Sequence, residues 1–426
     1  MSWQPVLAGA ARRRALAAVR EIVAALPAPS APELTDASLA SGAAGLAVLC
    51  AYLSRAGLDD DENAASFLAQ ALAALTAAPM GPALYTGFTG IAWAAAHLQD
   101  QLLDADVPDP HAEIDRALRR HLARKPWRAD YDLVNGLVGF GVYALERAAR
   151  PSARALLQQV GARLAETAEH TPAGITWHTR PHLLPARQRA QLPRGYYNLG
   201  LAHGVPGVVA LLGAACAAGV ARAQARTLLD GAVSWLLSQQ ADEAAPSAYA
   251  SWLGQDSESV YKLNPDGAAA PCRLAWCYGD AGVAAALFVA ARACGEADWL
   301  RTALSLARRA ARRSFETAGV RDAGLCHGAA GLGHVFNRLY QATGERELGA
   351  AARRWFARAL ALRRADERLA GFLTHRPDAA GTDVWVAGPG LLTGAGGVAL
   401  ALLAACTPVE PAWDRFLLLS APPARI

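Results

Sequence analysis

Two cysteine-containing tripeptides are the part of this sequence best suited to chemistry. C-Y-G at 277–279 and C-H-G at 326–328 each place a cysteine two residues before a glycine that opens a repeated motif. If the repeats occupy equivalent positions in the fold, Cys277, Cys326 and His327 lie close together. Two thiolates and one imidazole suit Zn²⁺, and three protein ligands leave the fourth coordination position open, as in catalytic zinc sites.

The other cysteines allow one alternative. Cys272 lies five residues before Cys277 and could close the site as a fourth ligand, which would make the zinc structural. Seven cysteines are an odd number in a large chain without an export signal, which favours thiols or metal ligands over a disulfide framework. The remaining four lie in apolar helical runs and are expected to be small buried side chains: Cys50, Cys216, Cys294 and Cys406.

The repeated motif is the tetrad G-x-x-G followed by a long apolar run, and it predicts the fold. It begins at seven positions: Gly42, Gly87, Gly136, Gly204, Gly279, Gly328 and Gly394. Each tetrad is typical of the start of a buried helix, with glycine where backbones approach closely. The segments between them are more polar and carry one apolar face, as in Leu348, Ala352, Trp355, Ala359 and Leu362. We therefore predict an all-α fold, an α/α toroid with seven inner apolar helices and seven outer amphipathic helices.

Inserted loops lengthen some of the repeats. The clearest insertion covers residues 176–195, which contain three prolines and several basic residues, and a second lies near 241–271. Such insertions commonly carry binding functions. No linker divides the chain into independent parts, so we expect a single domain over residues 1–426.

The residue immediately before the first glycine of each tetrad differs among the repeats. Ser41, Thr86, Asn135 and Thr393 suit helix capping, because their side chains could accept the free N–H groups of the inner helix. The other three residues are His203, Tyr278 and His327, which are not favoured N-caps. A functional site on the same rim of the toroid explains these three better.

Composition and charge exclude several classes of protein. The chain is 53% hydrophobic and 18% charged, with a net charge of +4, and its arginines are scattered, so we expect no nucleic-acid partner. Residues 1–26 are predicted to form an amphipathic first helix rather than a signal peptide, since Arg20 and Glu21 interrupt the apolar stretch. The uncharged stretches 195–221 and 386–409 are long enough to cross a membrane, but each matches a repeat unit. We expect no membrane span and a cytoplasmic protein.

Three strings around these residues resemble the lanthipeptide cyclases (LanC family). They are L-A-H-G-V-P-G at 201–207, C-R-L-A-W-C-Y-G-D-A-G at 272–282 and G-L-C-H-G-A-A-G at 324–331. The resemblance spans nearly the whole chain, and W-C-Y-G followed by C-H-G is its most specific part. It implies that Cys277, Cys326 and His327 are zinc ligands. It also implies the catalytic residues: His203 as acid/base, with Asp132, Arg273 and Tyr278. Asp280 after C-Y-G departs from the expected pattern, and the sequence assigns it no role.

The resemblance implies a zinc-dependent enzyme that adds peptide cysteine thiols to dehydroalanine or dehydrobutyrine in a Michael-type reaction, forming thioether rings. Zinc would lower the pKa of the substrate thiol, and His203 would protonate the enolate while Asp132 orients or charges the imidazole. Arg273 would hold the enolate oxygen or brace Asp132. Two structural alternatives stay open: an ion pair between Arg273 and Asp132, and Tyr278 as a packing residue.

The expected partners follow from the same resemblance. The substrate would be a dehydrated precursor peptide, and a dehydratase and an exporter could form a complex with the chain and bring it to the membrane. Other functions remain open: a prenyltransferase-like zinc toroid, a LanC-like protein that adds glutathione to dehydroamino acids, or a non-catalytic scaffold with four protein ligands on zinc. The adjacent Cys-His pair and W-C-Y-G favour the cyclase.

Overall fold

The computed structural model describes residues 2–32, 34–102, 111–254, 271–365, 367–378 and 382–420. These residues contain fifteen α-helices, three short 3₁₀ helices and seven short strands. The chain divides into two compact units. The first unit comprises Met1–Pro108 and Val320–Trp413, and the second comprises Asp109–Gly319 and Asp414–Ile426. A single domain over residues 1–426 stays a prediction.

Each of the seven G-x-x-G tetrads begins a buried helix, as predicted. These inner helices are α2 (Ala43–Arg55), α4 (Phe88–Leu102), α6 (Leu137–Glu146), α9 (Val205–Ala217), α11 (Asp280–Cys294), α13 (Ala329–Thr343) and α15 (Ala395–Cys406). Every residue of α15 is buried. A helix buried on all sides has to be apolar all round, which explains why these segments lack a polar face.

Seven outer helices alternate with them along the chain. They are α1 (Gly9–Ala24), α3 (Glu62–Ala77), α5 (Ala112–Leu122), α7 (Pro151–Thr167), α10 (Arg222–Ser238), α12 (Ala297–Arg312) and α14 (Arg346–Ala361). The outer helices bury one face only. In α14 the predicted apolar stripe is buried except for Leu362, which follows the helix and is half-buried, while Arg353 and Arg354 are exposed. The first helix, α1, buries Ala15, Ala18, Val19 and Ile22, which agrees with the predicted amphipathic segment.

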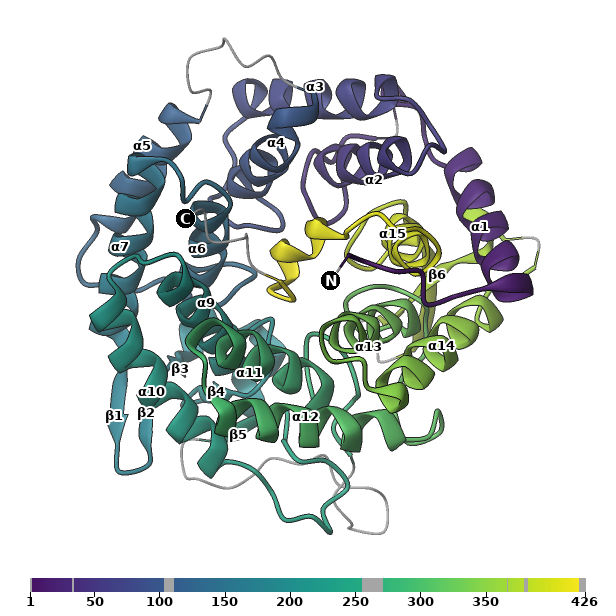
Figure 1. Ribbon diagram of the computed structural model, residues 1–426. Coiled ribbons are helices and arrows are strands. Elements are labelled where there is room, and N and C mark those ends of the chain that lie inside the picture. Colours follow the sequence, from purple (N-terminus) through teal and green to yellow (C-terminus); the bar gives the residue numbers. More distant parts are fainter. Residues whose placement is uncertain are drawn as a thin grey trace. The chain divides into compact units, whose positions relative to one another are not determined.

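The inner helices pack side by side within each unit. In the first unit the order is α13, α15, α2, α4, and the outer helices α14, α1 and α3 cover this row (Figure 1). In the second unit α6, α9 and α11 form the row, covered by α7, α10 and α12, with α5 against α7. Apart from α5, each outer helix therefore packs against an inner helix of the same unit.

A tight backbone turn precedes the inner helices and explains the two glycines of the tetrad. A Cβ atom at Gly42 would lie 2.1 Å from the carbonyl oxygen of Asp36, and one at Gly45 would lie 2.4 Å from that of Leu39. Real Cβ atoms do not approach backbone this closely, so both positions require glycine.

The same turn supplies the hydrogen bonds that begin the helix. The first three N–H groups of α2, from Ala43 to Gly45, each donate to a carbonyl seven residues earlier, at 2.9, 3.2 and 3.4 Å. The corresponding bonds begin α6, α13 and α15. Backbone carbonyls therefore accept the hydrogen bonds of the N–H groups that a capping side chain would otherwise bind.

The predicted capping role of Ser41, Asn135 and Thr393 is therefore wrong. The N-cap residues of these helices are glycines, Gly42, Gly136 and Gly394, without a side-chain capping bond. In the repeat of Thr86, the N–H of Phe88 likewise donates to the carbonyl of Gly81, at 3.0 Å.

The insertion predicted at 176–195 departs from the helical pattern. It contains β3 (His178–Thr179), the 3₁₀ helix η1 (Pro181–Leu183) and α8 (Ala186–Gln191). Strand β3 pairs antiparallel with β4 (Tyr196–Asn198), which pairs with β5 (Trp252–Gly254). Much of the second predicted insertion, 241–271, lies outside the described residues, at 255–270.

The remaining short elements form two hairpins and two further 3₁₀ helices. They are β1 (Glu169–Thr171) paired with β2 (Gly174–Thr176), β6 (Leu373–Pro377) paired with β7 (Asp383–Ala387), η2 (Leu369–Gly371) and η3 (Ala412–Leu417). Among the described residues, none of the helices combines the length and apolar character that a membrane crossing requires.

Candidate metal and catalytic site

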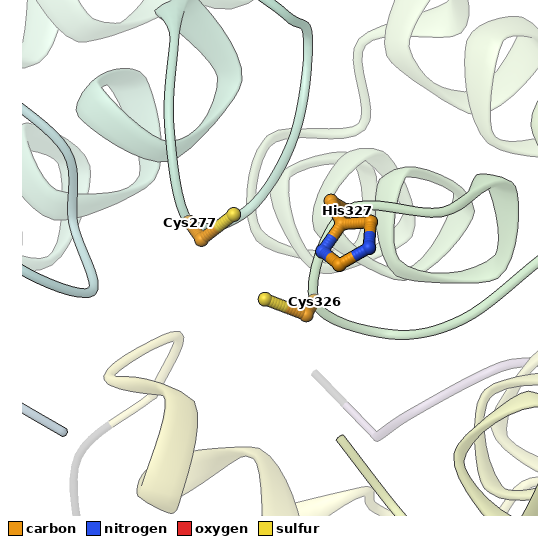
Figure 2. Close-up of side chains that lie close together, drawn as sticks. All are labelled: Cys277, Cys326 and His327. Atoms are coloured by element: carbon orange, nitrogen blue, oxygen red, sulfur yellow. The ribbon is translucent and has the colours of Figure 1, made fainter. Parts of the chain in front are cut away.

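The three predicted metal ligands come together. Cys277, Cys326 and His327 each offer one ligand atom, and these atoms lie within 4.8 Å of one another. Figure 2 shows their side chains gathered around a common space. Cys277 is buried and the other two are half-buried, so an ion held here would remain accessible. Two sulfur donors and one imidazole fit the preferences of zinc.

The turns before the inner helices position these ligands. Cys277 lies in the turn before α11, and its carbonyl accepts the N–H of Ala202 at 3.3 Å. Cys326 and His327 lie in the turn before α13, where the N–H of Cys326 donates to the carbonyl of Leu392 at 2.8 Å. The backbone of the ligands is thus fixed by hydrogen bonds as well as by the glycine turns.

Asp322 lies beside His327 and was missed from the sequence. Its Oδ2 atom lies 3.6 Å from Nε2 of His327 and accepts the N–H of His375 at 3.0 Å. Its Oδ1 atom accepts the N–H of Gly324 at 3.1 Å, so the buried carboxylate is held in place. A signal was present: an Asp or Asn stands six residues before the first glycine in four repeats, at Asp36, Asp130, Asn198 and Asp322.

Cys272 is not a member of the group that the described residues offer. Its thiol lies 3.1 Å from the hydroxyl of Ser251, and its N–H donates to the hydroxyl of Ser247 at 2.6 Å. Burial raises the pKa of the Cys272 thiol to about 11, which favours the protonated form. Of the other cysteines, Cys294 is half-buried, and three are buried as predicted: Cys50, Cys216 and Cys406.

His203 and Asp132 form a hydrogen-bonded pair in the second unit. Nδ1 of His203 lies 2.6 Å from Oδ2 of Asp132. The carboxylate is buried and its Oδ1 accepts the N–H of Asn135 at 2.6 Å, whereas the histidine side chain is 37% exposed. Burial lowers the pKa of His203, but the hydrogen bond and negative charge of Asp132 outweigh it, so the pKa is raised overall. The imidazole can therefore hold a proton and remain accessible to a substrate.

Tyr278 packs on this histidine. The two rings are stacked, with centroids 6.2 Å apart and planes inclined by 28°. Nδ2 of Asn198 donates to the Tyr278 hydroxyl at 2.9 Å. Burial raises the pKa of Tyr278 well above its usual value, so the phenol stays protonated.

Arg273 and Asp280 stand on either side of the C-Y-G motif and differ in burial. Arg273 is exposed, and within the described residues the ion pair of Asp132 is with His203 rather than with Arg273. Asp280 is fully buried at the start of α11, where its two oxygens accept the N–H groups of Ala248 and Tyr249, each at 3.1 Å. This carboxyl therefore anchors the preceding loop to the helix, which gives the residue a structural role.

A cavity of about 290 Å³ opens beside the His203–Asp132 pair. Its walls also include Tyr278 and Asp130. Burial and then the charge of Asp132 raise the pKa of Asp130 to about 7. The rest of the wall comes from the insertion and its neighbours: Thr179, Leu183, Leu184, Pro185, Gln188 and Tyr196, with Asn135 from the turn before α6. The sequence predicted a binding function for the insertion, but it did not predict that residues of the insertion line this cavity.

Comparison with solved structures identifies the class of fold. The structure of nisin cyclase is similar, with a TM-score of 0.71 and 17% sequence identity, covering 96% of this chain and 97% of that one. The likeness confirms the predicted all-α fold, an α/α toroid. The family model for lanthionine synthetase C-like proteins matches residues 33–418, so the chain belongs to that family. A comparison with curated protein sequences found no match.

Proposed function

We propose that this protein is a zinc-dependent lanthipeptide cyclase. It adds the cysteine thiols of a dehydrated peptide to dehydroalanine or dehydrobutyrine and forms lanthionine or methyllanthionine rings. The observation that carries the proposal is the pairing of accessible His203 with buried Asp132 at a cavity that also includes Tyr278, the residue next to Cys277. The name of the structural neighbour, a cyclase, supports the same chemistry.

Cys277, Cys326 and His327 would hold the zinc ion. When bound, zinc supplies Lewis-acid activation of a thiol, which makes a thiolate nucleophile available at neutral pH. Their chemistry supports this assignment, because thiolate and imidazole donors favour zinc over hard cations.

The reaction also requires the transfer of one proton from the thiol to the α-carbon of the acceptor. Addition forms a bond between the peptide sulfur and the β-carbon of the acceptor, and the electron pair of the double bond moves to the α-carbon and its carbonyl as an enolate. His203 donates a proton to the α-carbon through Nε2, because Nδ1 is bound to Asp132. The proton lost by the thiol balances this donation and restores the imidazolium, which Asp132 stabilises.

Two other residues would assist this transfer. Arg273 is exposed, and its guanidinium would stabilise the enolate oxygen of a bound peptide. Tyr278 orients the imidazole by stacking on it. The acceptor residues must first be made by a dehydratase. We propose that this enzyme and an exporter are partners of a cytoplasmic cyclase.

The test uses the purified protein and a dehydrated peptide with one cysteine and one dehydroalanine. Ring closure leaves the mass unchanged, so thiol alkylation followed by mass spectrometry reports it: closed rings resist the reagent. We expect protection with the parent protein and with His170→Ala, an exposed histidine outside the cavity, and loss of protection with His203→Ala. Thiols that stay free with the parent protein would refute the proposal.

The same assay separates the alternatives. Glutathione supplied with a cysteine-free peptide tests for intermolecular addition, and prenyl diphosphate supplied with a cysteine peptide tests for prenyl transfer. Each product has a distinct mass gain. A scaffold would yield none of these products.

A further inference from the structure

The cavity beside His203 has an apolar wall that proton transfer does not use. Leu183, Leu184 and Pro185 of the insertion form this wall, whereas Asp132 and His203 lie on the turns before inner helices. We propose that this wall is an acceptor subsite: it binds an apolar side chain next to the dehydroamino acid of the peptide. The inference rests on the proposed function and specifies which peptide residue the insertion recognises.

The wall is held in place before any substrate arrives. The N–H groups of Leu183 and Leu184 donate to the carbonyls of Arg180 and Pro181, at 3.0 and 3.1 Å. The carbonyl of Leu184 also accepts Nη2 of Arg189 at 3.1 Å. Rigid preformed walls favour recognition because little conformational entropy is lost on binding.

Two contacts anchor this segment to the rest of the second unit. His182 approaches the carbonyl of Arg128, with Nε2 at 3.0 Å from the oxygen. On the other side, β3 pairs with β4 through Thr179 and Tyr196, both of which line the cavity. The apolar wall is therefore attached to the same unit that carries His203.

Chain geometry puts a neighbouring side chain in this cavity. The acceptor α-carbon has to reach His203 to be protonated, and the next α-carbon along a peptide lies only about 3.8 Å away. A volume of about 290 Å³ is close to the lower end of small-ligand pockets, about 300 Å³, so the cavity has room for a neighbouring side chain.

The charges around the cavity favour an apolar occupant. Asp132 is already paired with His203, so it does not offer a free negative charge to a cation. Leu184 is 4% exposed and Leu183 is half-buried, so a charged side chain placed against them would lose hydration, and these two leucines supply no polar partner. The burial of Asp130, which raises its pKa to about 7, further limits the negative charge.

The experiment measures binding without catalysis. Two fluorescent peptides carry one dehydroalanine and no cysteine, so neither can cyclise, and they differ only in having Leu or Asp beside the dehydroalanine. We expect the Leu peptide to bind about 10-fold more tightly by fluorescence anisotropy, as is typical of a hydrophobic pocket that loses its side chain.

Variants locate the effect. Leu183→Ser should weaken binding of the Leu peptide about 10-fold and leave the Asp peptide nearly unchanged. Leu192→Ser is the matched control: a half-buried leucine of the same insertion that does not line the cavity, so it should change neither peptide. Leu183→Met keeps an apolar side chain and should retain parent affinity. It tests the wall if the serine variant fails to fold.

Equal affinity for the two peptides, or equal losses from Leu183→Ser and Leu192→Ser, would overturn the subsite. Failure of the proposed function looks different. In that case selective binding that depends on Leu183 would persist while a cysteine-containing peptide is not cyclised. Conversely, cyclisation without any dependence of affinity on Leu183 would leave the function standing and remove the subsite.

Discussion

Oδ2 of Asp132 lies 2.6 Å from Nδ1 of His203, and this bond determines which ring nitrogen is left for a substrate. In the proposed mechanism, Nε2 is therefore the atom that exchanges a proton with the peptide. His203→Ala should therefore slow ring closure about 100-fold or more, the usual contribution of a general acid or base, while retaining bound metal. Alkylation kinetics and metal analysis on the same sample check both statements. Loss of metal from this variant would contradict the separation of proton transfer from metal binding.

Asp132→Asn should shift the pH dependence of ring closure. Asp132 raises the pKa of His203, so the protonated imidazole persists to higher pH in the parent than it would without the carboxylate. Removing the negative charge lowers this pKa, and the acid form is lost earlier as pH rises. The alkaline limit of the rate should move to lower pH. The rate is measured from about pH 5 to about pH 9, a range that includes the usual histidine pKa of about 6.5. An unchanged pH profile would show that another group donates the proton.

Cys326→Ala should abolish metal binding without unfolding the chain. Stability comes mainly from packed apolar helices, and the substitution leaves the G-x-x-G turn unchanged. The parent should contain about one zinc per chain, as expected of a single site. Cys294→Ala, at a half-buried cysteine outside the ligand group, is the control and should keep its zinc. Circular dichroism and metal analysis report the two properties separately, and a zinc-replete Cys326→Ala protein would refute the ligand assignment.

Asp322→Asn should weaken zinc binding about 10- to 100-fold, the usual effect of removing a carboxylate that orients a metal-bound histidine. The amide keeps one oxygen, so one of the N–H groups of Gly324 and His375 loses its acceptor, and circular dichroism checks that the fold persists. Competition with a zinc chelator gives the affinity directly. Asp230→Asn, at an exposed partner of Arg226 on α10, should leave the affinity unchanged. If Asp322→Asn and Asp230→Asn bind zinc with the same affinity, Asp322 only shapes the turn.

Two glycine substitutions should have opposite effects on stability. Gly45→Ala would place a Cβ 2.4 Å from the carbonyl oxygen of Leu39 and should lower the free energy of unfolding by about 1–3 kcal/mol. Gly161→Ala lies inside α7, with its nearest neighbour 3.8 Å away, and should raise it by up to about 1 kcal/mol through helix propensity. Urea unfolding followed by circular dichroism measures both. A stable Gly45→Ala protein would mean that the turn can relax.

The sequence predicted the helical layers because the G-x-x-G tetrads and the apolar stripes are local patterns. It predicted that Cys277, Cys326 and His327 lie close together, because they stand at the start of the same motif in neighbouring repeats. The capping prediction failed because the helix donors are satisfied by backbone carbonyls, and side-chain types do not reveal such bonds. Leu183 and Asp130 could not be assigned to one cavity, since the pairing of β3 with β4 depends on tertiary structure.

The backbone hydrogen bonds that begin α2, α6, α13 and α15 have a consequence for how these repeats can change. Because backbone carbonyls of these turns accept the first N–H groups of the helix, the side chain before the first glycine is not needed as a cap. Ser41, Thr86 and Asn135 are exposed at this position, while in the proposed function His203 and His327 use it for proton transfer and metal binding. Evolution could therefore exchange side chains there at little cost in stability, so that one repeated scaffold offers several independent places to acquire or lose a reactive group.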